Sequence, residues 1–293
     1  MATQVARSRI ALDTILLATD FSPESENALK WAVALAKRYE ARLVLAHAVT
    51  GEANITAGEM WPQLNGIGLG GAVSNMCKLE QNEDLSSLPH DAVVQSGDVW
   101  EVLAPIVTDR QVDLIVMGTH GSGGLDRLIL GSTAEKVIRH ALCPVITVGP
   151  RVRVQSASRF SNILFATDFS VGSLRALTYA LSLALEDRAE LTMLHIIESK
   201  PMSQAEMLEW RRQDRERLLQ LLPPDLDLAC RPEIEIEAGV AAREILLLAE
   251  TRNADLIVMG SHPGGNVSTH LPWTTLHHVL QRAPCPVLTV RSA

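Results

Sequence analysis

Glycine and hydroxyl residues follow a short apolar run in the first half of the chain, and their spacing suits the binding of phosphate. The run DLIVMG ends at Gly118, and Gly121, Gly131, Ser132 and Thr133 come after it. Glycine lets the backbone bend tightly and approach a ligand closely, and the N–H groups at the start of a helix attract anions. The pattern therefore indicates a site for a polyphosphate that needs no lysine or arginine. The alternative is that these glycines only shape a turn.

The segments that must position this loop occur twice in the chain. Residues 15–47 match residues 163–195 at an offset of 148, with 16 of 33 positions identical. At an offset of 142, DLIVMGTH at 113–120 matches DLIVMGSH at 255–262, and CPVITV matches CPVLTV near the end of each half. Because the matches keep their order, we expect the whole fold to be duplicated.

Each half is predicted to alternate strands and helices. Helices are expected after the Ser22–Pro23 and Asp98 start signals and over residues 132–141. Apolar runs predict strands at 15–18, 42–49, 92–97, 113–118 and 144–148. Such alternation implies parallel pairing with right-handed crossovers. We therefore predict an α/β fold of two tandem, doubly wound domains, each built on a five-stranded parallel sheet.

The boundary between the domains is expected near residues 149–159, a polar stretch without a periodic apolar face. The predicted domains are residues 1–150, with the full glycine pattern, and residues 151–293, in which that pattern is altered. In such sheets, ligands bind beyond the carboxyl ends of the strands, where strand order reverses. Asp20 follows the first predicted strand of the first half and His47 ends the second, so a site is expected there.

Composition and charge argue against several classes of partner. Lys plus Arg is 26 and Asp plus Glu is 34, a net charge of −8, which disfavours binding to a nucleic-acid backbone. No stretch reaches the roughly 18 apolar residues of a membrane helix, and the N-terminal segment reads as a strand rather than a signal peptide. The four cysteines match no zinc pattern. We expect them to be reduced and mostly buried, in a cytoplasmic protein.

Three features together resemble the universal stress protein family in its tandem two-domain form. They are the ATDFS opening at 18–22, the MGTHG turn at 117–121 and the spaced glycines that end at Gly131. The resemblance covers nearly all of both halves. It implies a Rossmann-like, adenine nucleotide alpha hydrolase-like fold with strand order 3-2-1-4-5. It also implies that the chain binds ATP, with Mg2+ as a possible companion of the nucleotide.

The resemblance assigns roles to residues of the first half. Asp20 and Ala48 would lie on the adenine and ribose side, and Met117 would line the same cleft. Ala48 is smaller than the aliphatic residue often found there, which would weaken adenine packing by about 1 kcal/mol. The full set of expected nucleotide-binding residues is Thr19, Asp20, Ala48, Met117, Gly118, His120, Gly121, Gly131, Ser132 and Thr133. No catalytic residue and no metal ligand from the protein is expected.

The second half is predicted to bind ATP poorly or not at all. Pro263 replaces Gly121 and removes a backbone N–H from the loop. Trp273 replaces Gly131 and places an indole where a phosphate should approach. Asp168 remains, and a local hydrogen bond within its turn would explain its presence. The second half is then expected to pair with the first as an intramolecular pseudo-dimer or to bind another ligand, and a homodimer is plausible.

Weaker signals have simpler explanations. Residues 66–71, GIGLGG, follow no strand, and the stretch 51–71 reads as a mobile loop that would cover the cleft. His47 and His195 sit at equivalent strand ends and are expected to be hydrogen-bonded structural residues. Residues 207–222 predict an amphipathic, solvated outer helix.

Three functions remain in competition. The first is an ATP-binding protein with a regulatory or stress-response role and at most slow hydrolysis. The second is a true ATPase or nucleotidyl transferase, for which no base or lysine aimed at the phosphates is evident, although Arg127 lies in the loop. The third is a scaffold that holds a non-nucleotide ligand in the same cleft. Fold alone does not separate them.

Overall fold

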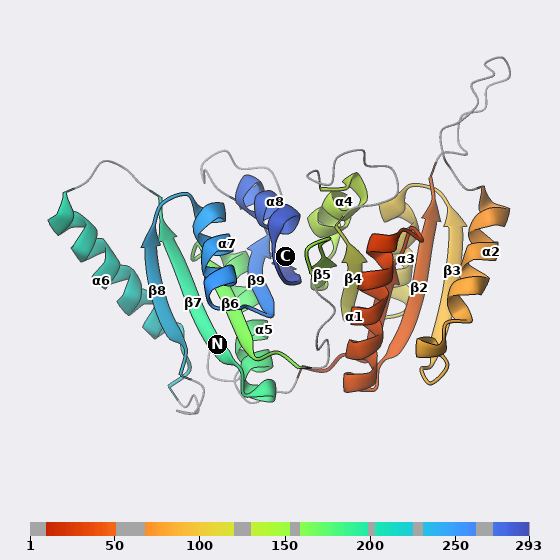
Figure 1. The fold of residues 1–293 in the computed structure, drawn as a ribbon, viewed down its shortest axis with the longest axis horizontal. Helices are drawn as coiled ribbons and strands as arrows, with labels where there is room; N and C mark the ends of the chain where they lie inside the picture. Colours follow the sequence, from red (N-terminus) through yellow and green to blue (C-terminus); the bar gives the residue numbers. More distant parts are fainter. Residues whose placement is uncertain are drawn as a thin grey trace, which may run out of the picture. The chain divides into compact units, whose positions relative to one another are not determined.

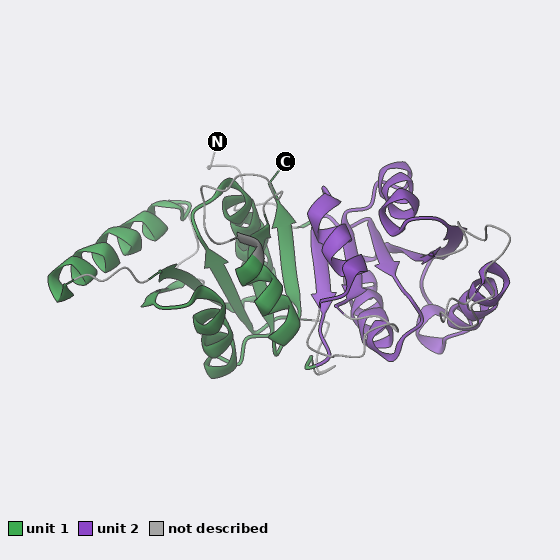
Figure 2. Ribbon diagram, turned by 90° about the horizontal axis from the view of Figure 1, so that it is seen from above, with its two compact units in different colours: residues 1–10, 151–293 green, residues 11–150 purple. Residues whose placement is uncertain are grey.

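The computed structural model describes residues 10–50, 68–119, 130–152, 159–198, 203–224, 231–261 and 272–292. The chain forms two compact units, shown in different colours in Figure 2. We call residues 11–150 the N-terminal unit, and residues 151–293 together with 1–10 the C-terminal unit.

The N-terminal unit is built on a parallel sheet in the order β3-β2-β1-β4-β5 (Figure 1). Its strands are β1 (Thr14–Ala18), β2 (Arg42–Val49), β3 (His90–Ser96), β4 (Leu114–Gly118) and β5 (Val145–Val148). Its helices are α1 (Pro23–Tyr39), α2 (Leu69–Glu80), the 3-10 helix η2 (Glu83–Leu85), α3 (Val99–Asp109) and α4 (Ser132–His140). Right-handed crossovers in this order place α1 and α2 on one face of the sheet and α3 and α4 on the other.

The C-terminal unit repeats this plan with strand order β8-β7-β6-β9-β10. Its strands are β6 (Asn162–Thr167), β7 (Glu190–Ile197), β8 (Glu233–Ala238), β9 (Leu256–Ser261) and β10 (Val287–Arg291). Its helices are α5 (Val171–Asp187), α6 (Gln204–Gln220), α7 (Ala241–Thr251) and α8 (Pro272–Arg282). The predicted tandem, doubly wound α/β fold is therefore confirmed.

The central strands bury side chains on both faces because helices cover both. Ile15, Leu16 and Leu17 of β1 are fully buried, which explains why the strand reads as an unbroken apolar run. The helix that follows starts as its sequence predicts: the Ser22 hydroxyl accepts the N–H of Ser25, and Pro23 is the first helical residue.

The prediction of a loop over residues 51–71 is wrong for its last residues, which form the start of a helix. Residues 51–67 lie outside the described residues, but α2 begins at Leu69 and Gly68 caps it. Ala72 and Met76, four residues apart, form the buried face of α2. The consecutive glycines at 70 and 71 hid this start, because glycine disfavours a helix by about 1 kcal/mol relative to alanine.

The first helix of the C-terminal unit lies directly against the fourth strand of its sheet. A Cβ atom added at Gly260 of β9 would lie 2.7 Å from the Cα of Ser173 and closer still to its amide nitrogen. One added at Gly172 would lie 2.9 Å from the carbonyl oxygen of Ser261. Glycine at these positions is required by backbone packing.

We predict that Gly260→Ala destabilises the C-terminal unit by about 1–3 kcal/mol, because the methyl group must displace the backbone of α5. Thermal unfolding measures this as a loss of several degrees in Tm. Gly70→Ala is the matched control, since an added Cβ there meets nothing within 4 Å. An unchanged Tm for Gly260→Ala would contradict this packing.

The cysteines that the structure describes are Cys77, Cys143 and Cys285, and all three are free thiols. Burial raises the pKa of the Cys143 and Cys285 thiols to about 12. Cys285 is buried and Cys143 is half-buried, whereas Cys77 is exposed on α2, so the expectation of mostly buried cysteines does not hold for Cys77. Cys230 lies outside the described residues.

We predict that a thiol reagent at pH 8 modifies Cys77 rapidly in a Cys230→Ser background and spares Cys143 and Cys285 until unfolding. The reason is that a buried thiol with a pKa near 12 forms almost no thiolate at that pH. Reagent consumption with and without denaturant measures the difference. Rapid modification of Cys285 in the folded protein would contradict it.

Candidate functional site

The sheet of the N-terminal unit gathers the predicted residues at one edge. Ala18 of β1 lies beside Ala46 of β2 and Met117 of β4. Because the strands are parallel, Asp20, which follows β1, and Ala48, near the end of β2, share this edge. Strand order reverses between β1 and β4, which is where ligands bind in open sheets of this kind.

The turn between β1 and α1 is held by its own polar side chains. Thr19 is buried, and its hydroxyl oxygen accepts the N–H of Phe21, whose φ is +61°. Asp20 Oδ1 accepts from both the N–H and the hydroxyl of Ser22. Asp20 thus stabilises the start of α1, whatever else it contacts.

The C-terminal unit contains the same turn. Thr167 Oγ1 accepts the N–H of Phe169, and Asp168 Oδ1 accepts the N–H of Ser170 at 3.0 Å. This is the local hydrogen bond that we expected for Asp168. The turn accounts for the aspartate in both units without a ligand.

The two strand-end histidines also have a structural role. His47 Nδ1–H donates to the carbonyl oxygen of Thr19 at 2.7 Å, and His195 Nδ1–H to that of Thr167 at 2.8 Å. Ala48 follows His47 along β2, so its side chain points to the opposite face of the sheet. His47 therefore does not share the face on which Ala48 lies.

A backbone hydrogen bond brings the start of α4 to the end of β4. Thr119 is buried, and its carbonyl oxygen accepts the N–H of Gly131 at 2.9 Å. Gly131 caps α4 without a side chain, and Ser132 and Thr133 form the exposed first turn of that helix. The first N–H groups of a helix have no partner within it, so this turn presents donors at the positive end of the helix dipole.

Two predicted residues of this loop, His120 and Gly121, lie outside the described residues, as does Arg127. The other eight predicted residues fall at the carboxyl edge of β1, β2 and β4 or on the first turn of α4 and its cap.

Gly118 has a second explanation besides a ligand. It corresponds to Gly260 at the offset of 142, where the first helix of the C-terminal unit leaves no room for a Cβ. In the N-terminal unit α1 likewise packs on β4. Gly131 has no such counterpart, because the C-terminal unit carries tryptophan at that position.

Sequence reasoning missed a polar contact between α3 and α4. Lys136 Nζ forms an ion pair with Asp98, the cap of α3. The ring of Trp100 stacks on that of His140, with centroids 5.8 Å apart. Lys136 is four residues after Ser132 and so shares its helix face, a spacing that the sequence does display. The corresponding residues of the C-terminal unit are Val240 and His278, so the pair belongs to one unit only.

Neither a protein-held metal nor a membrane span is seen in the part of the chain that the structure describes. It contains no group of three or more His, Cys, Asp or Glu side chains placed to hold a metal ion. Within the same part, no helix is long and apolar enough to cross a membrane.

Fold and site together define a tandem pair of doubly wound α/β domains, and in the N-terminal unit a glycine-capped helix begins where the strand order reverses. The sequence profile described as the universal stress protein family matches residues 11–149 and 159–291. The chain therefore belongs to the universal stress protein family.

Relatives that match the whole chain and relatives that match one half of it support this membership. A universal stress protein of Mycolicibacterium smegmatis is 27% identical over 295 residues, which cover 94% of this chain and 96% of the relative. One of Thermus aquaticus is 32% identical over 143 residues, covering 46% of this chain and 97% of the relative. The crystal structure of a universal stress protein from Archaeoglobus fulgidus has the same fold, with a TM-score of 0.67 at 19% identity, covering 97% of this chain and 100% of that one.

We predict that Lys136→Gln raises the pKa of Asp98 toward its ordinary value. The hydrogen bond from Lys136 holds that pKa low, and the N–H of Trp100 adds to the effect. The ion pair therefore stabilises the fold above the ordinary pKa of aspartate, and the contribution is lost as pH falls. Carboxyl NMR titration measures the change. Asp91, whose pKa is lowered by Arg42, is the internal reference, and its pKa should not change in the variant. An unchanged pKa of Asp98 would show that Lys136 does not form this ion pair in solution.

Proposed function

We propose that the N-terminal unit binds ATP in the crevice between the ends of β1 and β4. The observation that carries this proposal is the glycine-capped first turn of α4, tied to the buried end of β4 by the hydrogen bond from Gly131 to Thr119. A helix start at the point where strand order reverses is a favourable place for a phosphate group.

The two ends of the nucleotide would meet different elements. Thr19, Asp20, Ala48, Met117 and Gly118 would lie toward the base and ribose. Gly131, Ser132 and Thr133 would hold the phosphates, joined by His120 and Gly121 of the loop. Mg2+ would accompany the phosphates rather than be held by a protein cluster. Lys136 adds a cation on the same helix face as Ser132.

The C-terminal unit is proposed to lack this activity. Its helix α8 begins at Pro272, which corresponds to Leu130, so α8 starts two residues earlier than α4. The counterpart of Gly131 is then the second residue of a helix, Trp273, rather than a cap. A proline at the helix start also supplies no N–H.

A regulatory role with little hydrolysis fits the proposed site better than an enzyme. Asp20 Oδ1 is engaged with Ser22, and Asp98 is paired with Lys136. Neither arrangement favours a general base for water. A scaffold for another ligand is tested by the same experiment as ATP binding: mass spectrometry of small molecules released from the purified protein, followed by calorimetric titration with ATP, ADP and AMP, with and without Mg2+.

We predict that Ser132→Ala with Thr133→Ala weakens ATP binding about tenfold or more, because two hydroxyl donors to a charged phosphate are lost. Thr274→Ala with Thr275→Ala, the matched change in α8, should leave the affinity unchanged. Calorimetry measures both. Equal losses in the two double variants would place the nucleotide in both units, and a loss only in the α8 variant would reverse the assignment.

A bulky substitution at the cap gives a stricter test. Gly131→Trp places in the N-terminal unit the residue that the C-terminal unit carries at this position. It should abolish ATP binding while the thermal unfolding of the protein remains cooperative. Retained affinity would rule out the first turn of α4 as the phosphate site.

A further inference from the structure

Helix α6 of the C-terminal unit is attached to the sheet by an unusual buried group. Nearly all of its residues are exposed, and only Asp214 and Leu218 are buried. Among the described residues of the whole chain, Asp214 is the only buried Asp, Glu, Lys or Arg. Burying a carboxylate is costly unless a partner compensates its charge.

The partner of Asp214 is His195 at the end of β7. Asp214 Oδ2 lies 3.6 Å from His195 Nε2, and both side chains are largely shielded from solvent. His195 Nδ1 already donates its proton to the carbonyl oxygen of Thr167. A neutral imidazole held in this way turns the lone pair of Nε2 toward the carboxylate, so two acceptors face each other. A proton between them converts the repulsion into an ion pair.

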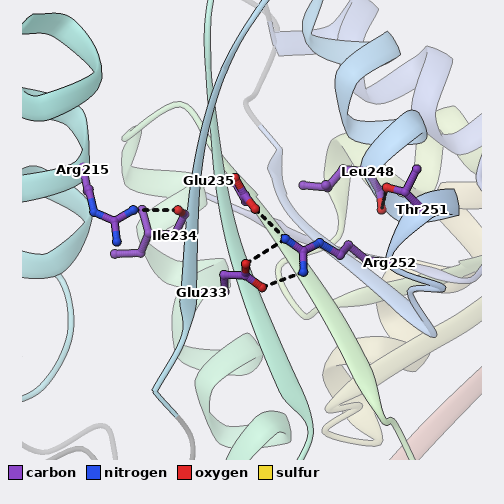
Figure 3. Close-up of polar contacts among 7 residues, drawn as sticks. All are labelled: Arg215, Glu233, Ile234, Glu235, Leu248, Thr251 and Arg252. Carbon is purple, nitrogen blue, oxygen red and sulfur yellow. Dashed lines mark hydrogen bonds and ion pairs between the residues drawn. The ribbon is translucent and has the colours of Figure 1, made fainter. Parts of the chain in front are cut away.

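Further contacts join α6 to the same region. The guanidinium of Arg217 lies 3.9 Å from the centre of the Phe169 ring, which packs on the imidazole of His195 at 4.5 Å. Arg215 Nη1 donates to the carbonyl oxygen of Ile234 on β8 (Figure 3). These contacts do not require the uptake of a proton by the His195–Asp214 pair.

Charged groups near His195 lie on helix α6 and in the turn after β6. Helix α6 supplies Asp214, Arg217 and Arg211, and the last of these pairs with Glu237 of β8 at 3.5 Å. The turn after β6 supplies Asp168, which is bound to Ser170. The residue beside His195 on β8 is the apolar Ile236. Asp214 is the carboxylate that lies within ion-pair distance of the imidazole.

The N-terminal unit provides an internal comparison. His47 makes the same bond through Nδ1, and its ring lies 4.5 Å from Phe21. The helix that follows β2 is α2, whose buried residues are Ala72 and Met76 rather than an acid. The contact between a buried carboxylate and the strand-end histidine is therefore a property of the C-terminal unit.

We propose that the docking of α6 on the C-terminal unit is linked to the uptake of one proton by the His195–Asp214 pair. The protonated pair holds α6 against β7. Loss of the proton leaves a buried carboxylate facing an imidazole lone pair and favours release of the helix. This device is independent of the nucleotide site proposed above.

Hydrogen exchange of the full chain tests the proposal. After correction for intrinsic exchange rates, the protection of peptides from residues 204–220 should fall about fivefold or more between pH 6 and pH 8, since one proton permits up to tenfold per pH unit. Peptides of α5 should not follow this trend.

Two variants replace the titrating pair by a neutral hydrogen bond. In Asp214→Asn the amide can donate to His195 Nε2, and in His195→Gln the amide can donate to the carboxylate. Each should remove the pH dependence of hydrogen-exchange protection in α6 while the helix stays protected. If one variant fails to fold, the other variant tests the proposal. His47→Gln should keep the wild-type trend. A wild-type protein without the trend, or a trend that persists in the variants, would overturn the proposal.

Discussion

One backbone hydrogen bond, from the N–H of Gly131 to the carbonyl oxygen of Thr119, decides where α4 begins relative to β4. The bond joins the buried end of the strand to the backbone of the residue that caps the helix. It brings the first turn of a helix to the place where the sheet reverses its strand order. Every proposed phosphate contact among the described residues depends on that placement, because the donors belong to the backbone and hydroxyl groups of this turn.

The duplication separates what the fold needs from what a site needs. Both units contain the turn with Thr19 or Thr167 and its aspartate, and both contain glycine at the end of the fourth strand. The contact of Gly260 with α5 shows that packing alone is sufficient to require glycine there. Features present in one unit only carry more weight for function, and among them are Gly131, the Lys136–Asp98 ion pair and the His195–Asp214 contact.

The sequence predicted the strands and most helices well, because buried parallel strands read as apolar runs with clear start signals for the helices between them. It failed where the deciding contact was tertiary. The start of α2 was hidden by glycines, and its register depends on burying Met76. The Lys136–Asp98 pair joins residues 38 apart along the chain. The burial of Asp214 was equally hidden, since an aspartate in a charged helix reads as an exposed residue until the histidine opposite it is known.

Asymmetry between the units follows from small changes at equivalent places. In the N-terminal unit, the loop after the fourth strand ends in a glycine that caps the next helix. The helix after the second strand of this unit buries alanine and methionine. In the other, the corresponding helix starts earlier with proline, and the helix after the second strand buries an aspartate against a histidine. A duplicated fold can therefore carry the proposed anion-binding edge in one copy and the proposed proton-dependent contact in the other, since neither change disturbs the sheet on which both copies are built.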